Sequence, residues 1–314
     1  MRNVRSAARV YAPGSIGNLG PGFDALGLAV AGAGDTVLAR RAGRSGVTIL
    51  AAGHPAIPTE AARNSAGIAA LDVLRRTGAE DVGVELEITK GLALAAGLGG
   101  SAASAVAAAV AVDLLLGRPL GTDDLLAASL AGEAGVAGRH LDNVAPSLLG
   151  GAVLVRSLDP IDAIRLPVPE ALRVVLAHPQ QELRTAEARA VLPQMVSREI
   201  AVHQLAHTAA LVAGLCLGDL ALIGRALDDR LAEPARSPLL PGFAAAKAAA
   251  LAAGALGASI SGSGPTLFAL AASDEIAANV AAALAVSYIE SGLDCDVRVA
   301  EVDLDGAREL PDNP

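Results

Sequence analysis

The stretch that decides the fold is "VGVELEITKGLALAAGLGGSAASAVAAAV", residues 82–110. Residues 82–90 alternate apolar with polar or charged side chains, which is typical of a half-buried strand. A glycine-rich segment follows, and residues 100–116 have the composition of an alanine-rich helix. Free backbone N–H groups at a helix N-terminus, with the positive end of the helix dipole, bind anions without any lysine. The stretch therefore predicts a phosphate-binding loop that comprises Gly97, Leu98, Gly99, Gly100, Ser101 and Ala102.

Close packing of a helix against a strand is the alternative explanation for these glycines. A turn between a strand and a helix often carries glycine for that reason alone. No G-x-x-x-x-G-K-[ST] segment is present, so a Walker-type loop is excluded. The hydroxyl of Ser101 offers a further ligand for a phosphate or a metal ion.

The composition restricts the class of protein. The chain has 314 residues, of which 53% are hydrophobic and only 2% aromatic, so its core consists of Ala, Leu, Val and Ile. This length predicts two lobes. A formal net charge of -9 argues against a nucleic-acid partner, which requires a basic face. The two cysteines, Cys216 and Cys295, lie far apart in the sequence and indicate a reduced, cytoplasmic location.

Membrane insertion is not expected either. The first residues, "MRNVRSAARVYAPGS", contain no apolar run long enough for the core of a signal peptide. Residues 91–112 and 244–260 are apolar, and a membrane span needs roughly 20 such residues. Glycines interrupt the first segment and Lys247 interrupts the second, so both are interpreted as buried helices.

The remaining elements predict an α+β protein with lobes at residues 1–160 and 161–314. A helix from a Thr122 cap to about Ala134 carries two aspartates in its first turn. The other expected elements are strands at 152–157 and 171–178, three or four helices within 185–253, strands on both sides of "SGSGP" (261–265), a helix at 274–291 and an edge strand at 295–304. Prolines between residues 160 and 169 mark the lobe boundary near residue 160.

A second glycine-rich segment, "APGSIGNLGPGFDALGLA", covers residues 12–29. Glycine allows positive φ and close approach to a ligand, and proline fixes φ, so together they shape a defined loop. Asn18 and Asp24 lie within it. The segment predicts the docking of a small molecule, and an ordinary turn from a strand into a helix, with a tight bend, is the alternative.

Further polar residues are candidates for a site. "GRHLDNVAPSLLGG" (138–151) brings His140, Asp142 and Asn143 together before a short helix, where Asp142 or Asn143 is alternatively the N-cap. Glu133, near the end of the preceding helix, is disfavoured by the helix dipole unless it has a partner such as Mg²⁺. A solvated helix end is the alternative for Glu133.

Two arginines complete the candidates. Thr185 and Arg189 are four residues apart on one predicted helix face, and Arg236 lies in a proline-bounded loop. Two guanidinium groups in one pocket would clamp a carboxylate through paired hydrogen bonds, although each arginine alone is more often a surface residue.

In this order the segments resemble the homoserine kinases of the GHMP small-molecule kinase superfamily, over nearly the whole chain. The motifs that carry the resemblance are "NLGPGFDALGLA", "GLGGSAAS", "HLDNVAPSLLGG" and "SGSGPTLFAL". The resemblance implies a two-lobed GHMP kinase fold. Its N-terminal lobe is like ribosomal protein S5 domain 2, its C-terminal lobe is ferredoxin-like, and the active site lies between them. The implied reaction is transfer of the ATP γ-phosphoryl group to the side-chain hydroxyl of L-homoserine, a step of threonine biosynthesis.

The resemblance also implies roles for individual residues. Ser101 and Glu133 occupy the positions of the Mg²⁺ ligands, and Asp24 that of the partner of the substrate ammonium group. Asn143 is expected near the reacting hydroxyl, and no catalytic base is assigned because phosphoryl transfer runs mainly on positioning and charge stabilisation. The ATP-phosphate loop extends through Ala103 to Ser104, and the implied substrate pocket comprises Asn18, Asp24, His140, Asn143, Thr185, Arg189 and Arg236.

Two departures from the family pattern and three alternatives accompany this interpretation. Gly100 stands where the family loop has its first serine, and "GLALA" lacks the proline that commonly precedes the loop. The alternatives are a threonine kinase or a mevalonate kinase of the same superfamily, or a catalytically silent metabolite-binding protein of the same fold. The expected partners are L-homoserine, ATP with Mg²⁺, and a second copy of the chain in a homodimer.

Overall fold

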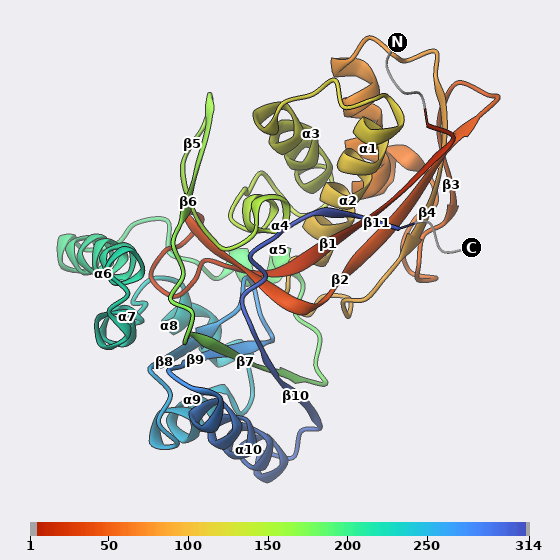
Figure 1. Ribbon diagram of the computed structural model, residues 1–314. Coiled ribbons are helices and arrows are strands. Elements are labelled where there is room, and N and C mark those ends of the chain that lie inside the picture. Colours follow the sequence, from red (N-terminus) through yellow and green to blue (C-terminus); the bar gives the residue numbers. More distant parts are fainter. Residues whose placement is uncertain (1–4, 312–314) are drawn as a thin grey trace.

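The computed structural model describes residues 5–311, and these residues form two lobes, each built on one β-sheet (Figure 1). The first residues of the N-terminal stretch considered above, 1–4, and the last three, 312–314, lie outside the described residues. Within the described range the larger sheet runs in the order β11-β1-β2-β4-β3, with β5 paired to β2 and β6 to β5. Its strands are β1 (Ala7–Gly17), β2 (Leu26–Ala42), β3 (Gly46–Ala51), β4 (Gly83–Thr89), β5 (Ala152–Leu158), β6 (Ile161–Leu166) and β11 (Arg308–Leu310).

The segment 12–29 is mostly strand, and its interpretation as one long loop was wrong. Residues 12–17 belong to β1 and residues 26–29 to β2, which pair antiparallel, so that the loop covers only residues 18–25. Some of its glycines serve packing rather than turning. A Cβ on Gly27 would lie 1.7 Å from the carbonyl oxygen of Asp142, so only glycine lets the 140–143 segment lie against this strand.

The helices of this lobe cover the sheet. α2 is buried on nearly all sides, since it lies between the sheet and its neighbours α1 and α3, and its alanines allow this close approach. Strand 82–90 and helix 100–116 are confirmed within one residue at each end. The helices are η1 (Ala61–Arg63), α1 (Ser65–Arg76), α2 (Gly100–Leu115), α3 (Thr122–Ala134) and α4 (Val144–Leu149).

The predicted cap of α3 was wrong in one respect. α3 has the predicted bounds and both aspartates in its first turn, but Gly121 is the N-cap, Thr122 is the first helical residue, and no side chain caps this end. Gly121 has the extended backbone that an N-cap takes, and Thr122 lies one residue too far into the helix to serve as the cap.

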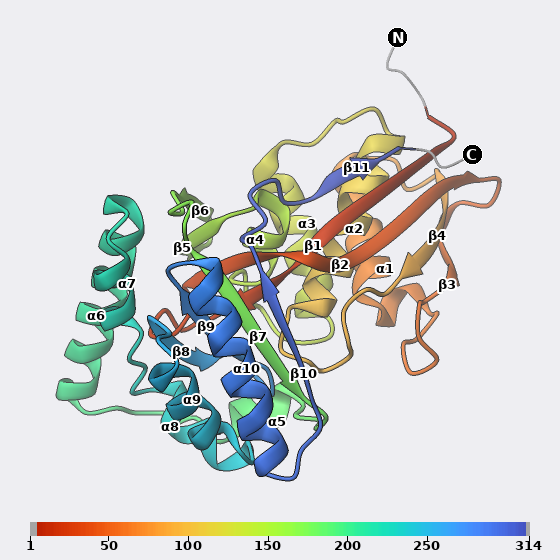
Figure 2. The same cartoon turned by 60° about the horizontal axis from the view of Figure 1, so that its bottom comes forward.

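The second sheet has the order β10-β7-β9-β8, with β10 at the edge as predicted. Helices α9 and α10 pack together on one face of it, and the pair α6–α7 lies apart from them (Figure 2). The strands are β7 (Arg173–Pro179), β8 (Gly257–Ile260), β9 (Leu267–Ala271) and β10 (Cys295–Ala300). The helices are α5 (Thr185–Ala190), α6 (Arg198–Leu217), α7 (Leu220–Ala226), α8 (Ala232–Arg236), η2 (Ser237–Leu239), α9 (Phe243–Ala252) and α10 (Asp274–Glu290).

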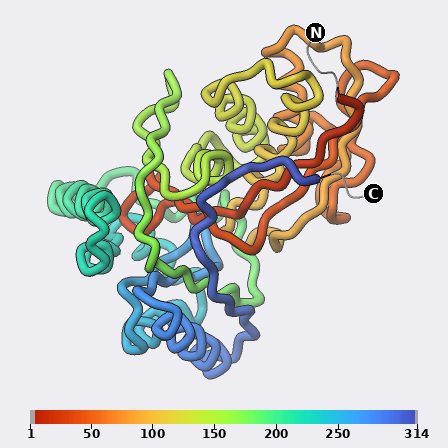
Figure 3. Tube along the Cα trace, in the orientation of Figure 1, coloured from red at the N-terminus to blue at the C-terminus, as the bar shows by residue number. Residues whose placement is uncertain are grey.

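The change from one sheet to the other occurs between Leu166 and Arg173. β6 extends the first sheet past residue 160, where the sequence placed the boundary between the lobes. After β10 the chain also returns to the first lobe, where Val302 bridges Val30 and β11 pairs with β1. Figure 3 shows this C-terminal segment running back along the first strands.

One described helix, α6, has the length and the composition to cross a membrane, and 22% of its apolar window is buried. The segment 244–260, considered above, instead forms the short helix α9 followed by β8.

Candidate active site

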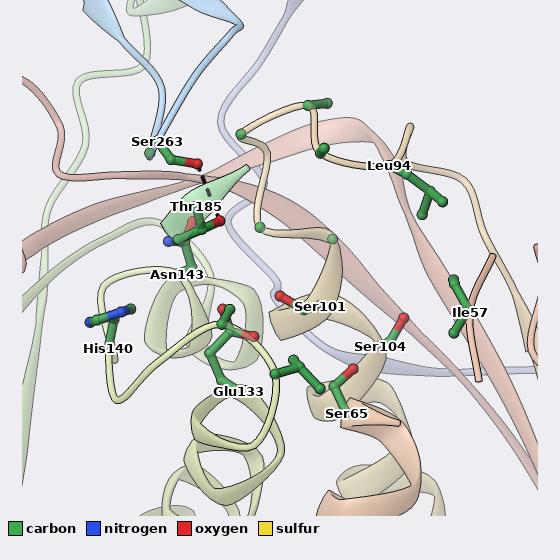
Figure 4. Close-up of a pocket in the computed structure, with 18 of the residues that line it drawn as sticks. Ile57, Ser65, Leu94, Ser101, Ser104, Glu133, His140, Asn143, Thr185 and Ser263 are labelled. Atoms are coloured by element: carbon green, nitrogen blue, oxygen red, sulfur yellow. Dashed lines mark hydrogen bonds between the residues drawn. The ribbon is translucent and has the colours of Figure 1, made fainter. Parts of the chain in front are cut away.

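A cavity of about 310 Å³ lies where the two lobes meet (Figure 4). It is lined by the glycine-rich loop, the 18–25 loop, the end of α3, the segment before α4, and parts of α5, α8 and the 261–265 turn. Three of the predicted residues, Leu98, Ala102 and Ala103, are buried beneath the cavity wall instead. The predicted residues that line it are Asn18, Asp24, Gly97, Gly99, Gly100, Ser101, Ser104, Glu133, His140, Asn143, Thr185, Arg189 and Arg236.

The glycine-rich loop is held against the 261–265 turn of the other lobe. Gly97 has φ 77° and Gly99 has φ 65°, a region in which side chains are strained. A Cβ on Gly97 would lie 2.5 Å from the carbonyl oxygen of Ser261, whose hydroxyl donates to the Gly97 carbonyl at 2.7 Å. These contacts give Gly97 a packing role, but against the 261–265 turn and not through the packing of a helix against a strand that was the alternative. The loop ends at the cavity, where the first N–H groups of α2 have no intrahelical partners, as at the start of any helix.

A partly buried lysine beneath this loop was missed by the sequence analysis. Lys90 forms an ion pair with Asp35, and its Nζ donates to the Gly100 carbonyl at 2.8 Å and to the Ser104 hydroxyl at 3.1 Å. Ser104 in turn donates to Asp35 at 2.5 Å. A lysine at the end of a half-buried strand, directly before the glycines, was the signal in the sequence.

Glu133 is a buried carboxylate at the end of the cavity that lies next to α2. Its side chain faces the cavity near Ser101 at the start of α2 (Figure 4). Its Oε2 has no hydrogen-bond partner among residues 5–311. Burial raises the pKa of Glu133 to about 7, the Ser101 hydroxyl opposes this rise, and the negative charge of Asp142 adds to it. The alternative of a solvated helix end is wrong, because the residue is only 5% exposed.

Asp142 is a second buried carboxylate, and burial raises its pKa to about 6. Its Oδ2 accepts a hydrogen bond from the Asn18 backbone N–H at 2.8 Å, and its Oδ1 has no partner in the described part of the chain. Asn143 occupies the N-cap position of α4, as the capping alternative predicted, but its side chain makes no capping hydrogen bond. Buried, unpartnered carboxylate oxygens next to a hydroxyl are donors that suit Mg²⁺.

Asn143 lines the cavity in the segment before α4. Its Oδ1 accepts from the Ser15 hydroxyl at 3.0 Å. A Cβ on Gly17 would lie 2.4 Å from Asn143 Nδ2, so the glycine makes room for this amide. Among residues 5–311 Nδ2 has no hydrogen-bond partner, which leaves a donor available at the cavity.

Asn18 holds the 18–25 loop together, because both groups of its amide are already bonded. It has φ 69°, its Nδ2 donates to the Gly262 carbonyl at 2.8 Å, and its Oδ1 accepts from the Asp24 backbone N–H at 3.1 Å. Asparagine tolerates this left-handed backbone better than most residues. Asn18 therefore connects the 18–25 loop to the 261–265 turn.

Asp24 and Arg189, predicted to bind opposite ends of a substrate, pair with each other. Arg189 Nη2 donates to Asp24 Oδ1 at 2.6 Å and to His140 Nδ1 at 2.9 Å. Burial and the nearby guanidinium of Arg189 lower the pKa of His140, which is therefore neutral near pH 7 and accepts through Nδ1. The Arg189 Nε has no partner among the described residues.

Arg236 is the last residue of α8, not part of a loop, and it is buried. Its Nε donates to the Ala188 carbonyl at 3.0 Å and its Nη1 to the Gly262 carbonyl at 2.7 Å. The guanidinium groups of Arg189 and Arg236 each lie 5.6 Å from the centroid of the Phe23 ring. The alternative of two unrelated surface arginines is therefore wrong, because both converge on the cavity.

Thr185, the first residue of α5, faces the same end of the cavity. Its hydroxyl lies 3.4 Å from that of Ser263 (Figure 4). Phe23 and Ser263 are residues that the sequence analysis did not select, although both lie within its quoted motifs.

Comparison with known proteins identifies the family. Residues 64–151 match the GHMP kinases N terminal domain, and residues 211–289 match the GHMP kinases C terminal. A homoserine kinase of Chlorobium phaeobacteroides is 43% identical, in an alignment that covers 96% of this chain and 98% of that protein. A homoserine kinase of Xanthomonas campestris is 45% identical and covers 98% and 95%.

The solved structures agree. The crystal structure of homoserine kinase from Cytophaga hutchinsonii superposes with a TM-score of 0.94 at 42% identity, covering 99% of each chain. Leishmania major mevalonate kinase in complex with R-mevalonate shares the fold, with a TM-score of 0.70 at 18% identity over 95% of this chain and 98% of that one. The chain therefore belongs to the homoserine kinases of the GHMP kinase family.

Proposed function

We propose that the chain phosphorylates the side-chain hydroxyl of L-homoserine and that both substrates bind in this cavity. The chain is an ATP-dependent kinase of the homoserine kinase family, which acts in threonine biosynthesis. The observation that carries the assignment of the two ends is made in this one cavity. One end combines the N-terminus of α2 with the buried carboxylate of Glu133, whose Oε2 has no partner in the described chain, and the other end combines two converging arginines with an aspartate. The first set suits a nucleotide with its metal ion, and the second suits an amino acid.

At the nucleotide end, the N–H groups of residues 99–102 bind the phosphates of ATP. Ser101 and Glu133 hold Mg²⁺, and the unpartnered Oδ1 of Asp142 supports adding this residue to the set. When bound, Mg²⁺ neutralises phosphate charge and orients the γ-phosphoryl group. Lys90, whose charge is neutralised by Asp35, supports the loop from beneath by donating to the Gly100 carbonyl. An apolar part of the cavity receives the adenine ring, and its residues are Ala52, Ile57, Pro58 and Leu94.

At the substrate end, Asp24 binds the ammonium group of homoserine, while Arg189, Arg236 and Thr185 bind its carboxylate. In the structure Asp24 and Arg189 already neutralise each other. Since homoserine carries one charge of each sign, its binding exchanges this internal ion pair for two new ones, and no net charge is buried. His140, neutral and bonded to Arg189, keeps the guanidinium oriented during the exchange.

The side-chain hydroxyl of homoserine is then placed between Asn143 and the γ-phosphoryl group. Asn143 Nδ2, held in place by the bond between Ser15 and Oδ1, orients this hydroxyl. No residue acts as a strong base in this proposal, because phosphoryl transfer depends chiefly on positioning and charge stabilisation. Closure of the cavity by the 18–25 loop excludes water from the transfer.

The other expectations stay proposals: a homodimer in the cytoplasm, with neither nucleic acid nor a membrane as partner. The net charge of -9 supports the absence of nucleic acid. Exposed apolar side chains along α6, Val202, Leu205 and Leu217, support a contact with a second copy. Sedimentation analysis of the purified chain tests the oligomeric state.

The experiment that tests the function measures ADP release with homoserine, threonine, serine and R-mevalonate at saturating MgATP. We expect homoserine to be used far better than the other three, with O-phosphohomoserine identified by mass spectrometry. Equal turnover of mevalonate or threonine would favour the corresponding alternative kinase. No turnover of any of the four, from folded protein that binds ATP, would favour a silent binding protein.

A further inference from the structure

A second cluster of ligand-type side chains lies on the C-terminal lobe, outside the cavity. His203 and His207 are one turn apart on α6, so both project from one face of this helix. Their rings stack, with centroids 3.8 Å apart and an angle of 22° between the planes. Figures 1 and 2 both show α6 and α7 at the edge of the molecule.

Asp228 completes the cluster from the turn after α7. Its Oδ2 lies 3.1 Å from His203 Nε2. Two ligands of one tetrahedral zinc ion lie about 3.4 Å apart, so this spacing is close to that of neighbouring metal ligands. One ligand atom from each of His203, His207 and Asp228 can be chosen so that all three lie within 4.8 Å of one another. Small rotations of the side chains bring such atoms around one ion.

The hydrogen bonds of His207 are those of a metal-ligating histidine. Its Nδ1 lies 3.2 Å from the Ala226 carbonyl oxygen, to which it can only donate. Nε2 then carries the free lone pair. A backbone carbonyl that accepts from the opposite ring nitrogen is the usual outer partner of a histidine ligand, because it fixes the tautomer and the ring orientation.

We propose that His203, His207 and Asp228 bind one divalent transition-metal ion of the zinc class, with water completing its coordination. Two imidazole nitrogens and one carboxylate suit Zn²⁺, Co²⁺ or Ni²⁺, whereas Mg²⁺ prefers oxygen ligands. The site is thus chemically distinct from the Mg²⁺ position at Glu133. In the absence of metal, the proton on His203 Nε2 occupies the place of the ion, since this nitrogen faces only acceptors, the carboxylate and the carbonyl of Asp228.

The ion would join elements that support the substrate pocket. Asp229, the next residue, accepts from Gln204 Nε2 at 3.0 Å and from the backbone N–H of Ala232 at 3.1 Å, at the start of α8. Gln204 also donates to the Pro21 carbonyl of the 18–25 loop at 3.2 Å. The metal therefore fixes α6 to the turn that orients α8, the helix that ends at Arg236.

One group competes for the same carboxylate. Arg230 Nε lies 3.4 Å from Asp228 Oδ2, and about half of its side chain is exposed. Its guanidinium must release Oδ2 when an ion binds. This costs little free energy, because water hydrates the guanidinium of an exposed ion pair. Removal of this side chain is therefore expected to leave metal affinity unchanged or to increase it, the opposite of removing a ligand.

The test titrates Co²⁺ into the full-length chain without nucleotide and records the visible absorption of the bound ion. We expect one ion per chain, displaced by Zn²⁺. We expect about tenfold weaker binding of Co²⁺, or a larger loss, in each of the variants His203→Ala, His207→Gln and Asp228→Asn. A tenfold change in affinity corresponds to about 1.4 kcal/mol of binding free energy. Arg230→Ala should bind at least as tightly as the parent chain. His54→Ala, at an exposed histidine on the other lobe, and Glu133→Gln, at the Mg²⁺ position, should leave the spectrum unchanged.

A second readout is thermal unfolding followed by circular dichroism, since the chain contains no tryptophan. A ligand that binds only the folded state raises Tm, so Zn²⁺ should raise the Tm of the parent chain and of His54→Ala but not of His207→Gln. The proposal is overturned if Co²⁺ does not bind, if the ligand variants bind as tightly as the parent, or if the signal disappears in Glu133→Gln. Circular dichroism also shows whether each variant is folded. None of these results depends on kinase activity.

Discussion

The two ends of the cavity carry charge in opposite ways. At the proposed nucleotide end, Glu133 is buried with an oxygen that has no partner in the described chain, and burial raises its pKa. Asp142, also buried, lies between the two ends, since burial and the charge of Asp24 raise its pKa and its own charge raises that of Glu133. At the proposed substrate end, Arg189 Nη2 lies 2.6 Å from Asp24 Oδ1, and each of the two side chains is about one third exposed. In the proposed function, a cation would stabilise the buried carboxylate of the first end, whereas the charges of the second end already neutralise each other and would change partners when a zwitterion binds.

Because of this difference, the two ends pose different free-energy costs for the binding of a ligand. A buried carboxylate without a partner costs free energy in the folded protein, and a metal ion removes that cost. An internal ion pair costs little by itself, but a substrate has to break it. Changes at the nucleotide end should therefore alter metal dependence and the stability of the free protein, while changes at the substrate end should alter the discrimination between substrates.

The largest effect is expected from Glu133→Gln. If this carboxylate holds the ion, its loss removes several kcal/mol of charge stabilisation, which corresponds to roughly a thousandfold in kcat/KM for ATP. The measurement is steady-state kinetics over a range of Mg²⁺ concentrations, with Glu290→Gln, an exposed residue at the end of α10, as the control. An unchanged rate at limiting Mg²⁺ would remove Glu133 from the metal end.

The stability of the metal-free protein should depend on the same residue and on pH. Burial raises the pKa of Glu133 from 4.5 to about 7, so the folded state keeps a proton that the unfolded state releases. The free energy of unfolding therefore falls as the pH rises from 4.5 to about 7, by at most about 3 kcal/mol.

Glu133→Gln removes the contribution of Glu133 to this dependence, while the contribution of Asp142, whose pKa burial raises to about 6, remains in both proteins. In the absence of Mg²⁺ the Tm of the variant should exceed that of the parent at pH 8 by roughly 5 °C, and the difference should vanish near pH 4.5. Thermal unfolding at several pH values measures it. A constant difference in Tm across this range would mean that Glu133 is already ionised in the folded protein, and the contrast between the two ends would be lost.

The substrate end is tested by Arg189→Lys and Arg236→Lys. Charge-assisted hydrogen bonds to a carboxylate contribute about 1.5 to 3 kcal/mol each, so each variant should lose roughly tenfold to a hundredfold in kcat/KM for homoserine. Lysine keeps the charge but not the planar fork. The carboxamide of homoserine, which has no carboxylate, should show a much smaller loss.

Arg225→Lys, at an exposed position on α7, is the matched control and should behave as the parent chain. The affinity for ATP should change little in all three variants. Equal losses with homoserine and with its carboxamide would show that these arginines serve the phosphoryl group or the fold, and the proposed amino-acid pocket would be wrong.

The smallest effect is expected from Gly100→Ser, which restores the serine of the family pattern. A Cβ at this position would lie 3.4 Å from Lys90 Nζ and 3.8 Å from Leu92, both ordinary contacts. Serine is better than glycine inside a helix by about 0.4 kcal/mol. We expect a slight gain in stability and an affinity for ATP within about twofold of the parent. A large gain in activity would indicate that the missing hydroxyl limits the nucleotide end.

Much of the fold was predictable from local patterns. The strand at 83–89, the helix at 100–115 and the edge strand at 295–300 follow from residues that are neighbours in sequence. The membership of β6 and β11 in the first sheet was not predictable, because pairing between distant strands depends on the whole chain. The 12–29 segment was misinterpreted for a related reason. Its glycines suggest a turn, but Gly27 lies within a strand, and its missing side chain leaves room for the carbonyl of Asp142, more than a hundred residues further along the chain.

For the site, too, some features follow from the sequence and others only from the tertiary structure. The sequence by itself determined the residue types and the order of the motifs, and these were enough to indicate phosphate binding, an amino-acid pocket and the family. Only the tertiary structure decided which charges meet. It pairs Asp24 with Arg189, buries Lys90 on Asp35, and leaves Glu133 without a partner for Oε2 in the described chain. The physical reason is that pairing and burial are properties of groups brought together from distant segments, and these set the pKa values and the cost of binding.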